Sequence, residues 1–187
     1  IGGEDPLWGH LWTYTAFAAV SKLLLAFKHG KRCQETTDSF MWSLRQRLTV
    51  IPEIVSDGLA CYEAGVARSF GNAVDYAQLV KTPSKKGKVS TVPFIRKKRV
   101  VGCPDMDRVS TSYVERHNST VRDQNKRFAR RTRCHSKKIE NHEAQFALYA
   151  VWYNFVRIPS TLKTTPAVAA GIASEPWTLA QLIEQAL

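Results

Sequence analysis

The sequence predicts an α/β domain with a mixed β-sheet flanked by helices, and three observations favour this class. Strand-like and helix-like hydrophobic patterns alternate along the chain, as in α/β folds. The chain begins with two strand-like segments in succession, so a hairpin and a mixed sheet are expected. Hydrophobic residues make up 44% of the 187 positions, which is enough for one packed core.

Six elements are predicted in the first half of the chain. The strands are rich in β-branched and aromatic residues, and the Ser21-Lys22 turn joins the first two. In the first helix, Phe40, Met41 and Leu44 recur at helical spacing, and Pro52 and Asp57-Gly58 bound the third strand. The predicted order is strand 11–18, strand 23–27, helix 35–48, strand 53–56, helix 59–70 and strand 74–80.

The second half begins with a basic insertion or long loop at about 81–108, where Lys, Ser, Gly and Pro break the pattern. A helix over 113–122 follows, capped by Ser110, Thr111 or Ser112. A second helix, over 136–157, is apolar nearly all round in its last half and is expected to be buried. A terminal helix is predicted within 174–187, starting near Pro176.

The charge of the chain points to an anionic partner. The formal net charge is +11, and eighteen Lys and Arg lie between Lys81 and Lys138, against four acids. Nucleic-acid phosphate is the expected ligand, because each cation placed on a phosphate releases condensed counterions; a membrane surface and a solvated face are the alternatives. The cations expected to contact DNA are Lys126, Arg127, Arg130, Arg131, Arg133, Lys137 and Lys138, with further clusters at Lys85-Lys86 and Arg96–Arg99.

Other features narrow the class of protein. No apolar run reaches the length of a transmembrane helix. The four cysteines lack CxxC spacing, so structural zinc is not expected and reduced cytosolic thiols are the default. The chain begins with Ile, so we interpret it as a possible piece of a longer protein.

Two carboxylates are candidates for chemistry. Asp57 follows an apolar strand at the expected sheet edge, where it either faces a ligand or makes an Asx turn or helix cap. Glu115 lies early in a predicted helix, where it either binds a metal or favours the helix dipole. Arg122 lies seven residues later and therefore on the same helix face.

Short stretches that match the sequence pattern of one known protein family are spread over nearly the whole chain. The most specific are Ser112-Tyr-Val-Glu-Arg116 and Ser136-Lys-Lys-Ile-Glu-Asn-His142. The others are Leu11–Ala16, Ser21–Leu24, Ile54–Gly58 with Tyr62, Val74–Lys81, Ala147–Tyr149, Tyr153–Phe155 and Thr165-Pro166. On these residues the chain resembles the DDE transposases of bacterial insertion sequences, most closely the family of insertion sequence 1.

The resemblance implies a single RNase H-like catalytic domain over 1–187, in which three carboxylates hold two Mg²⁺ or Mn²⁺ ions. Asp57 would be the second catalytic and metal-binding acid, Glu115 the third, and Arg122 would contact DNA. The implied reaction is cleavage at a transposon end, followed by attack of the freed 3′-hydroxyl on target DNA. The implied partners are transposon-end and target DNA and other copies of the chain. The implied location is the bacterial cytoplasm, with the nucleoid.

The chain departs from the family at the first acid. Ala18 occupies the position where the resemblance places an Asp at the end of the first strand, and a methyl group cannot bind a metal. Catalysis is therefore expected to be absent or strongly impaired. Ala18 is an introduced substitution, or the mark of a transposase that keeps only DNA binding, or a sign that the strand is misaligned. None of Glu4, Asp5, Glu35 and Asp38 ends the first strand.

Two rival functions remain open from the sequence. One is a non-catalytic DNA-binding or architectural protein on the same scaffold, and the other is a basic RNA-binding domain. Related enzymes carry an amino-terminal end-binding module, and none is visible in this sequence. We therefore expect weak, salt-sensitive and nearly sequence-independent DNA binding by this chain.

Overall fold

The computed structural model describes residues 11–86 and 89–185 of the chain. Two compact units are present. Unit 1 comprises the described residues of 1–14 and 28–112, and unit 2 comprises those of 15–27 and 113–187. The predicted class is confirmed at the level of an α/β fold with a mixed sheet. The prediction of a single domain stays a prediction.

The chain opens with the expected hairpin, in which β1 (Trp12–Phe17) pairs with β2 (Leu24–Gly30). The connecting loop is closed by the Ala18 N–H, which donates to the Leu23 carbonyl over 2.9 Å. Lys22 adopts a positive φ of 59° within this loop, as turns often require. The second strand runs to Gly30, three residues beyond its predicted end.

Two helices of unit 1 pack against each other, α1 (Gln34–Arg45) and α2 (Cys61–Phe70). A methyl group at Gly65 would lie 3.1 Å from the Thr37 Cγ2 atom and 3.4 Å from the Met41 Cγ atom. Gly65 therefore lets the two helices approach closely. The predicted helices were right in type, although α1 ends at Arg45, before the predicted Leu48.

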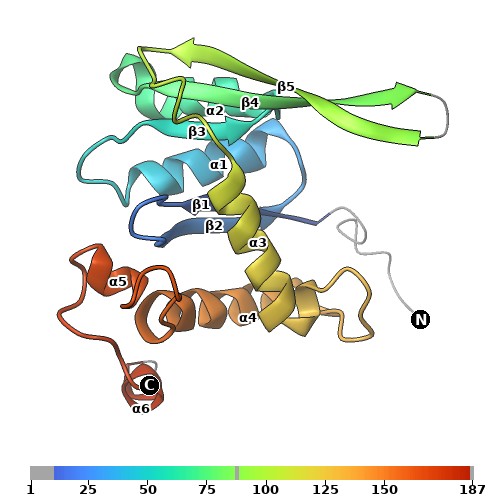
Figure 1. Ribbon diagram of the computed structural model, residues 1–187. Helices are drawn as coiled ribbons and strands as arrows, with labels where there is room; N and C mark the ends of the chain where they lie inside the picture. Colours follow the sequence, from blue (N-terminus) through green and yellow to red (C-terminus); the bar gives the residue numbers. More distant parts are fainter. Residues whose placement is uncertain (1–10, 87–88, 186–187) are drawn as a thin grey trace. The chain divides into compact units, whose positions relative to one another are not determined.

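The sheet of unit 1 has the order β3-β4-β5, built from β3 (Ile54–Asp57), β4 (Tyr76–Lys86) and β5 (Val89–Val101). A short 3₁₀ turn, η1 (Gly71–Ala73), precedes β4. The β3 strand is parallel to β4 and pairs Ile54 with Tyr76 and Asp57 with Leu79, whereas β4 and β5 are antiparallel. In Figure 1 the β4–β5 pair is the long twisted ribbon of this unit.

The long loop predicted at about 81–108 was wrong over 81–86 and 89–101, because these residues lie in the antiparallel strands β4 and β5. That this segment is a basic insertion stays a prediction. The prediction of a loop gave weight to Lys, Ser and Pro, whereas the β-branched residues Val80 and Thr82 alternate with Lys81 and Pro83 at the spacing of a strand. The register shifts between Thr82 and Ser84, which flank a proline. A bulge is where a strand tolerates a residue without an N–H.

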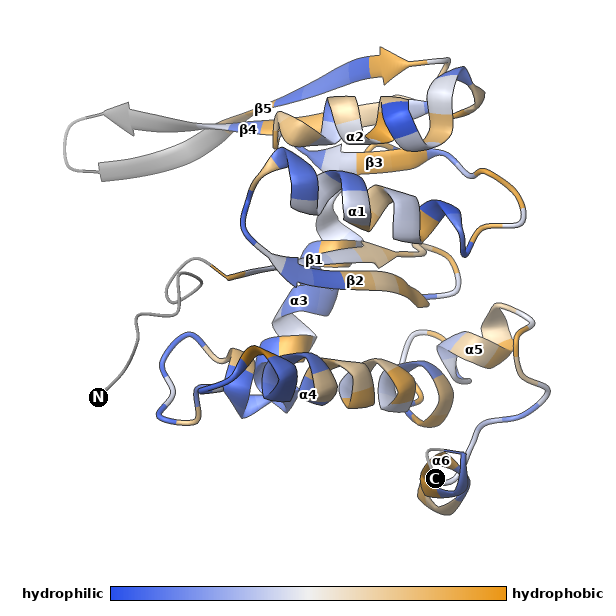
Figure 2. Cartoon of the chain, turned by 180° about the vertical axis from the view of Figure 1, so that it is seen from behind, coloured by the Kyte–Doolittle hydropathy of each residue, from blue (hydrophilic) through white to orange (hydrophobic). Residues whose placement is uncertain are grey.

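Unit 2 is mostly helical. It contains α3 (Ser112–Gln124), the 3₁₀ turn η2 (Lys126–Phe128), α4 (Ile139–Val151), the π-helical turn η3 (Trp152–Val156), α5 (Pro166–Ala169) and α6 (Leu179–Glu184). Figure 2 draws the segment between α3 and α4 largely in the blue of hydrophilic residues. The terminal helix begins at Leu179 and not near Pro176, because Thr178 forms a capping box with Gln181.

The core of unit 2 gathers aromatic and aliphatic side chains from the hairpin and from three helical elements. Its buried members are Leu24, Val121, Phe146, Tyr149, Ala150 and Tyr153. The expectation that the last half of the 136–157 helix is buried all round was wrong, because Leu148 is 55% exposed and Val151 37%. Only one face of α4 meets this core. Within the described ranges, no helix is both long and apolar enough to cross a membrane.

Candidate functional site

Asp57 is the last residue of β3, in unit 1, and its side chain is exposed. Its Oδ1 atom accepts a hydrogen bond from the Leu59 backbone N–H over 3.1 Å, which is the Asx-turn geometry weighed from the sequence. The preceding Ser56 hydroxyl lies 2.8 Å from the Tyr76 hydroxyl in the interior. The end of β3 is thus fixed beneath a carboxylate that still faces solvent.

A small hollow of about 90 Å³ adjoins Asp57 in unit 1. It is lined by Trp12, Thr13, Tyr14, Arg32, Asp57, Leu59 and Tyr62. The Arg32 guanidinium lies 4.9 Å from the centre of the Trp12 ring, a cation–π contact. Burial, followed by the negative charge of Asp57, raises the pKa of the Tyr62 phenol. Asp57 therefore borders a hollow that also holds a cation and three aromatic rings.

Ala18, which occupies the position expected for the first acid, lies in unit 2 directly after β1. The Thr15 hydroxyl donates to the Asn118 Oδ1 atom over 3.4 Å, and the Phe17 and His117 rings are 4.7 Å apart between centroids. These contacts bring the end of β1, and with it the stretch that leads into Ala18, against α3. The loop after Ala18 reaches α3 as well, because the Lys22 ammonium lies 3.8 Å from the centre of the Tyr113 ring.

Glu115 lies in the first turn of α3 and its side chain is exposed. Arg122 is also exposed on the same helix, about 20° from Glu115 around the axis. The buried residues His117 and Val121 lie about 200–240° away from Glu115, on the opposite side. The structure therefore presents Glu115 and Arg122 on one open face of α3, as their spacing predicted.

His117, two residues after Glu115 on α3, is buried and does not face a site. It is 2% exposed, neither of its ring nitrogens has a hydrogen-bond partner in the described part of the chain, and its ring packs against Phe17 and Tyr153. Burial, followed by the positive charge of Arg157, lowers the pKa of His117 to about 4. It is a neutral residue of the core.

The eight predicted DNA-contacting cations of unit 2 are all exposed. They are Arg122, Lys126, Arg127, Arg130, Arg131, Arg133, Lys137 and Lys138. Seven of them fall between 126 and 138, where the sequence has no acid. This segment is therefore a strongly positive surface.

The basic cluster of β5 is partly occupied by contacts within unit 1. The Lys97 ammonium donates to the Met106 carbonyl over 2.6 Å, and Lys98 forms a salt bridge of 2.6 Å with Glu63. These two cations have structural partners, so the surface interpretation is favoured for them. The side chains of Lys85 and Lys86 lie outside the described residues.

The residues expected to bind metal are divided between the units. Asp57 belongs to unit 1, whereas Ala18 and Glu115 belong to unit 2. Over 11–86 and 89–185, no group of three or more His, Cys, Asp or Glu side chains is placed to hold a metal ion. The Ala18 methyl group offers no ligand atom. The four cysteines are free thiols.

Comparison with known proteins gives no relative: no protein-family model, curated protein or solved structure matches the chain. What the protein does must be inferred from its own residues.

Proposed function

We propose that this protein is an RNase H-like, transposase-type protein of the insertion sequence 1 family that binds DNA. DNA strand cleavage and strand transfer on this scaffold require a carboxylate at position 18, where the chain has Ala. As it stands, the protein binds DNA without cutting it. The observation that carries the proposal is the exposed, acid-free run of seven cations over 126–138 on the same unit as Glu115.

The positions of the candidate acids support the transposase part of the proposal. Position 18 directly follows β1, Asp57 ends β3, and Glu115 lies in the first turn of α3. Each acid position thus falls at the end of an element, where a side chain is open to solvent and held by a rigid backbone. In unit 2, the contacts of Thr15 and Phe17 with α3 hold the end of β1 near the helix that carries Glu115.

The charge distribution supports the DNA part of the proposal. A surface charged only for solubility would mix both signs, whereas the 126–138 segment carries cations alone. Contacts from such a segment position the nucleic-acid backbone and do not read its bases. The protein is therefore expected to bind duplexes of unrelated sequence with similar affinity.

The residues present do not fit a two-metal site. A pair of Mg²⁺ or Mn²⁺ ions supplies charge stabilisation to the attacking and leaving oxygens of phosphoryl transfer. Such ions need several converging carboxylates, and Ala18 removes one of the three. We therefore derive no cleavage step for the chain as it stands.

The test is the variant Ala18→Asp, assayed for nicking of supercoiled plasmid with Mg²⁺ or Mn²⁺. We expect nicking by this variant and none by the unchanged chain. Ala18→Asn is the matched control, because it has the same size without the ionised carboxylate. Asp57→Asn or Glu115→Gln, each added to Ala18→Asp, is expected to abolish nicking again.

The nicking and competition assays distinguish a catalytic scaffold from a DNA-binding protein without catalysis and from an RNA-binding domain. If Ala18→Asp binds plasmid but does not nick it under any of these conditions, the catalytic scaffold is ruled out and a binding-only protein remains. Competition between duplex DNA and an RNA of the same length tests the ligand. Stronger binding of the RNA would overturn DNA as the partner.

A further inference from the structure

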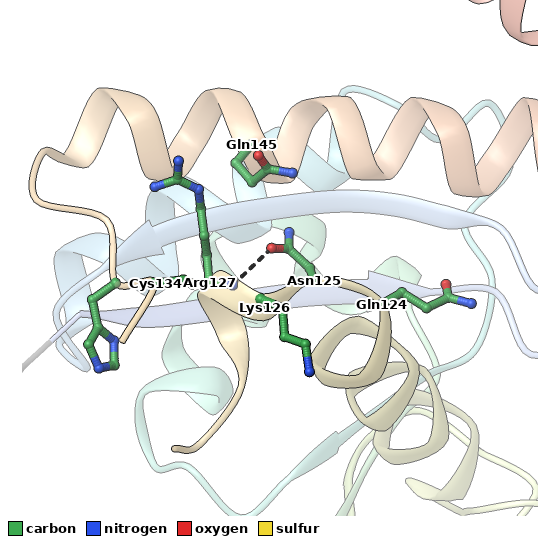
Figure 3. A pocket seen from close by; sticks show the side chains of 7 residues that line it. Gln124, Asn125, Lys126, Arg127, Cys134 and Gln145 are labelled. Carbon is green, nitrogen blue, oxygen red and sulfur yellow. Dashed lines mark hydrogen bonds between the residues drawn. The ribbon is translucent and has the colours of Figure 1, made fainter. Parts of the chain in front are cut away.

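A polar hollow in unit 2 lies where the end of α3, the η2 turn and the loop before α4 meet α4 (Figure 3). Its volume is about 520 Å³. Ligand sites typically measure about 300–1,000 Å³. Seven residues line the hollow and none carries a carboxylate: Gln124, Asn125, Lys126, Arg127, Cys134, His135 and Gln145. Of these, the sequence pointed only to Lys126 and Arg127.

Asn125 presents a buried hydrogen-bond donor at this hollow. Its side chain is 5% exposed, and its Oδ1 atom accepts the Arg127 backbone N–H over 3.2 Å. That bond identifies the other end of the amide as the NH₂ group, which can only donate. The Nδ2 atom has no hydrogen-bond partner in the described part of the chain. In Figure 3 it points toward α4 and Gln145.

Arg127 adds a cation to the lining of the same hollow. In Figure 3 its side chain rises toward α4 on the same side as the Asn125 amide, whereas Lys126 points the other way. One guanidinium nitrogen, Nη1, donates to the Ser136 hydroxyl over 3.4 Å, and Ser136 in turn lies 3.2 Å from the His142 Nδ1 atom. Arg127 is thus held by an uncharged partner, and its charge and other donors remain for a ligand.

We propose that this hollow binds one phosphate group of a polynucleotide backbone, with the Asn125 amide and the Arg127 guanidinium donating to its oxygens. A buried donor and a cation that line one hollow without carboxylates select an anion that accepts several hydrogen bonds. The hollow is larger than an isolated phosphate ion, so it also has room for the attached sugar. The backbone as the source of the phosphate rests on the proposed function, whereas the phosphate site itself does not.

The test follows the Asn125 and Gln145 side-chain amides by NMR of the ¹⁵N-labelled full chain. Dimethyl phosphate serves as the probe for a backbone diester, inorganic phosphate as the probe for a free ion, and a short duplex as the polymer. We expect saturable shifts of the Asn125 amide with dimethyl phosphate, and the same shifts at a lower concentration of duplex. If the Asn125 amide does not shift with dimethyl phosphate, inorganic phosphate or the duplex, the site is overturned.

Two variants and one matched control test the residues. Asn125→Asp keeps the acceptor for the Arg127 N–H but replaces the donor with a negative charge, and Arg127→Gln removes an exposed cation. Arg131→Gln removes the same charge from the same positive segment, 126–138, outside the lining. We expect losses of duplex affinity of about tenfold or more for the first two variants, and of only a few-fold for Arg131→Gln.

The results distinguish this site from the proposed function. If Arg127→Gln and Arg131→Gln weaken duplex binding equally, the hollow is not a site, although DNA binding stands. If phosphate and dimethyl phosphate saturate the Asn125 signal while no duplex binds, the phosphate site stands and the backbone assignment fails together with the DNA proposal. Arg127→Gln keeps the test decisive if Asn125→Asp does not fold.

Discussion

The side-chain amide of Asn154 pairs with both backbone polar groups of Leu24, 130 positions away in the sequence. Its Oδ1 atom accepts the Leu24 N–H over 3.0 Å, and its Nδ2 atom donates to the Leu24 carbonyl over 3.0 Å. Both residues are buried. The amide acts as one more peptide group beside β2, joining η3 to the start of that strand.

Replacing Asn154 by Leu is expected to destabilise the protein by roughly 2–4 kcal/mol, because two buried backbone groups of Leu24 lose their partner. Urea unfolding followed by circular dichroism measures this loss. Asn141→Leu, the same change on the exposed face of α4, is the control and is expected to alter stability by less than about 0.5 kcal/mol. Equal effects of the two variants would contradict the structural role of Asn154.

Gly102→Ala tests the turn that follows β5. Gly102 has a φ of +65°, and an added methyl group would lie 3.0 Å from the Val74 carbonyl oxygen and collide with the Asp75 carboxylate. That carboxylate accepts the Cys103 N–H over 2.7 Å. We expect a loss of about 2 kcal/mol or more, since backbone strain and steric overlap add.

Gly171→Ala is the matched control for this turn. Gly171 has a φ of +71° with no atom within 4 Å of the added methyl group, so only the cost of the backbone conformation applies, about 1 kcal/mol. Thermal unfolding compares the two variants. A larger loss for Gly171→Ala would show that the contacts around Gly102 are not as described.

Tyr76 makes stability depend on alkaline pH. Burial raises the pKa of its phenol from 10.0 to about 12, so the folded protein holds the proton more tightly than the unfolded chain does. The resulting stabilisation is fully present below pH 10 and is lost as the pH rises toward 12. Tyr76→Phe lacks this titration but also loses the bond to Ser56. Its stability is therefore expected to be lower at neutral pH and to approach that of the unchanged protein between pH 10 and 12.

Ser56→Ala is the control for this pH dependence, because it removes the same hydrogen bond and keeps the phenol. Its unfolding free energy, measured in urea at each pH, is expected to fall between pH 10 and 12 at least as steeply as that of the unchanged protein, because the Ser56 bond that this variant loses lowers the pKa of Tyr76. A constant difference between Tyr76→Phe and the unchanged protein across this pH range would contradict a raised pKa.

The double variant Arg130→Gln and Arg131→Gln tests the positive surface of unit 2. Both side chains are exposed, so the double change is expected to leave the fold intact. We expect the slope of log affinity for duplex DNA against log salt to fall by about 2, equally for unrelated sequences. Fluorescence anisotropy over a range of salt concentrations measures this slope. An unchanged slope would show that DNA does not contact these cations, and a loss confined to one sequence would show base recognition instead.

Elements with strong local patterns could be predicted from the sequence. The Phe40, Met41 and Leu44 spacing of α1 predicted its buried face, and the turn at Ser21-Lys22 predicted the β1–β2 hairpin. These signals depend on neighbours within a few residues, which the sequence displays directly. The start of β4 was predicted as a strand over 74–80, but the rest of the β4–β5 hairpin gave no comparable signal. Its strands are stabilised by hydrogen bonds to each other, and its Lys and Pro residues suggested a loop.

For the candidate site, the sequence located Asp57, Glu115 and the cations, and indicated that Asp57 could make an Asx turn, which it does. It could not show that His117 is buried while Glu115, two residues before it, is exposed, because this depends on which side of α3 meets the core. Nor could it single out Asn125. Its role depends on its amide oxygen accepting the Arg127 N–H, while the NH₂ group has no acceptor among the described residues.

The sequence alone therefore determined the class of fold, the order of most elements and the clustering of positive charge, since composition and short-range periodicity encode these. The tertiary structure decided which cations already have partners, which face of each helix is buried, and where a donor unpaired within the described ranges borders a hollow. The physical reason is that hydrogen bonds and burial join residues as distant as Leu24 and Asn154. No local pattern records such pairs.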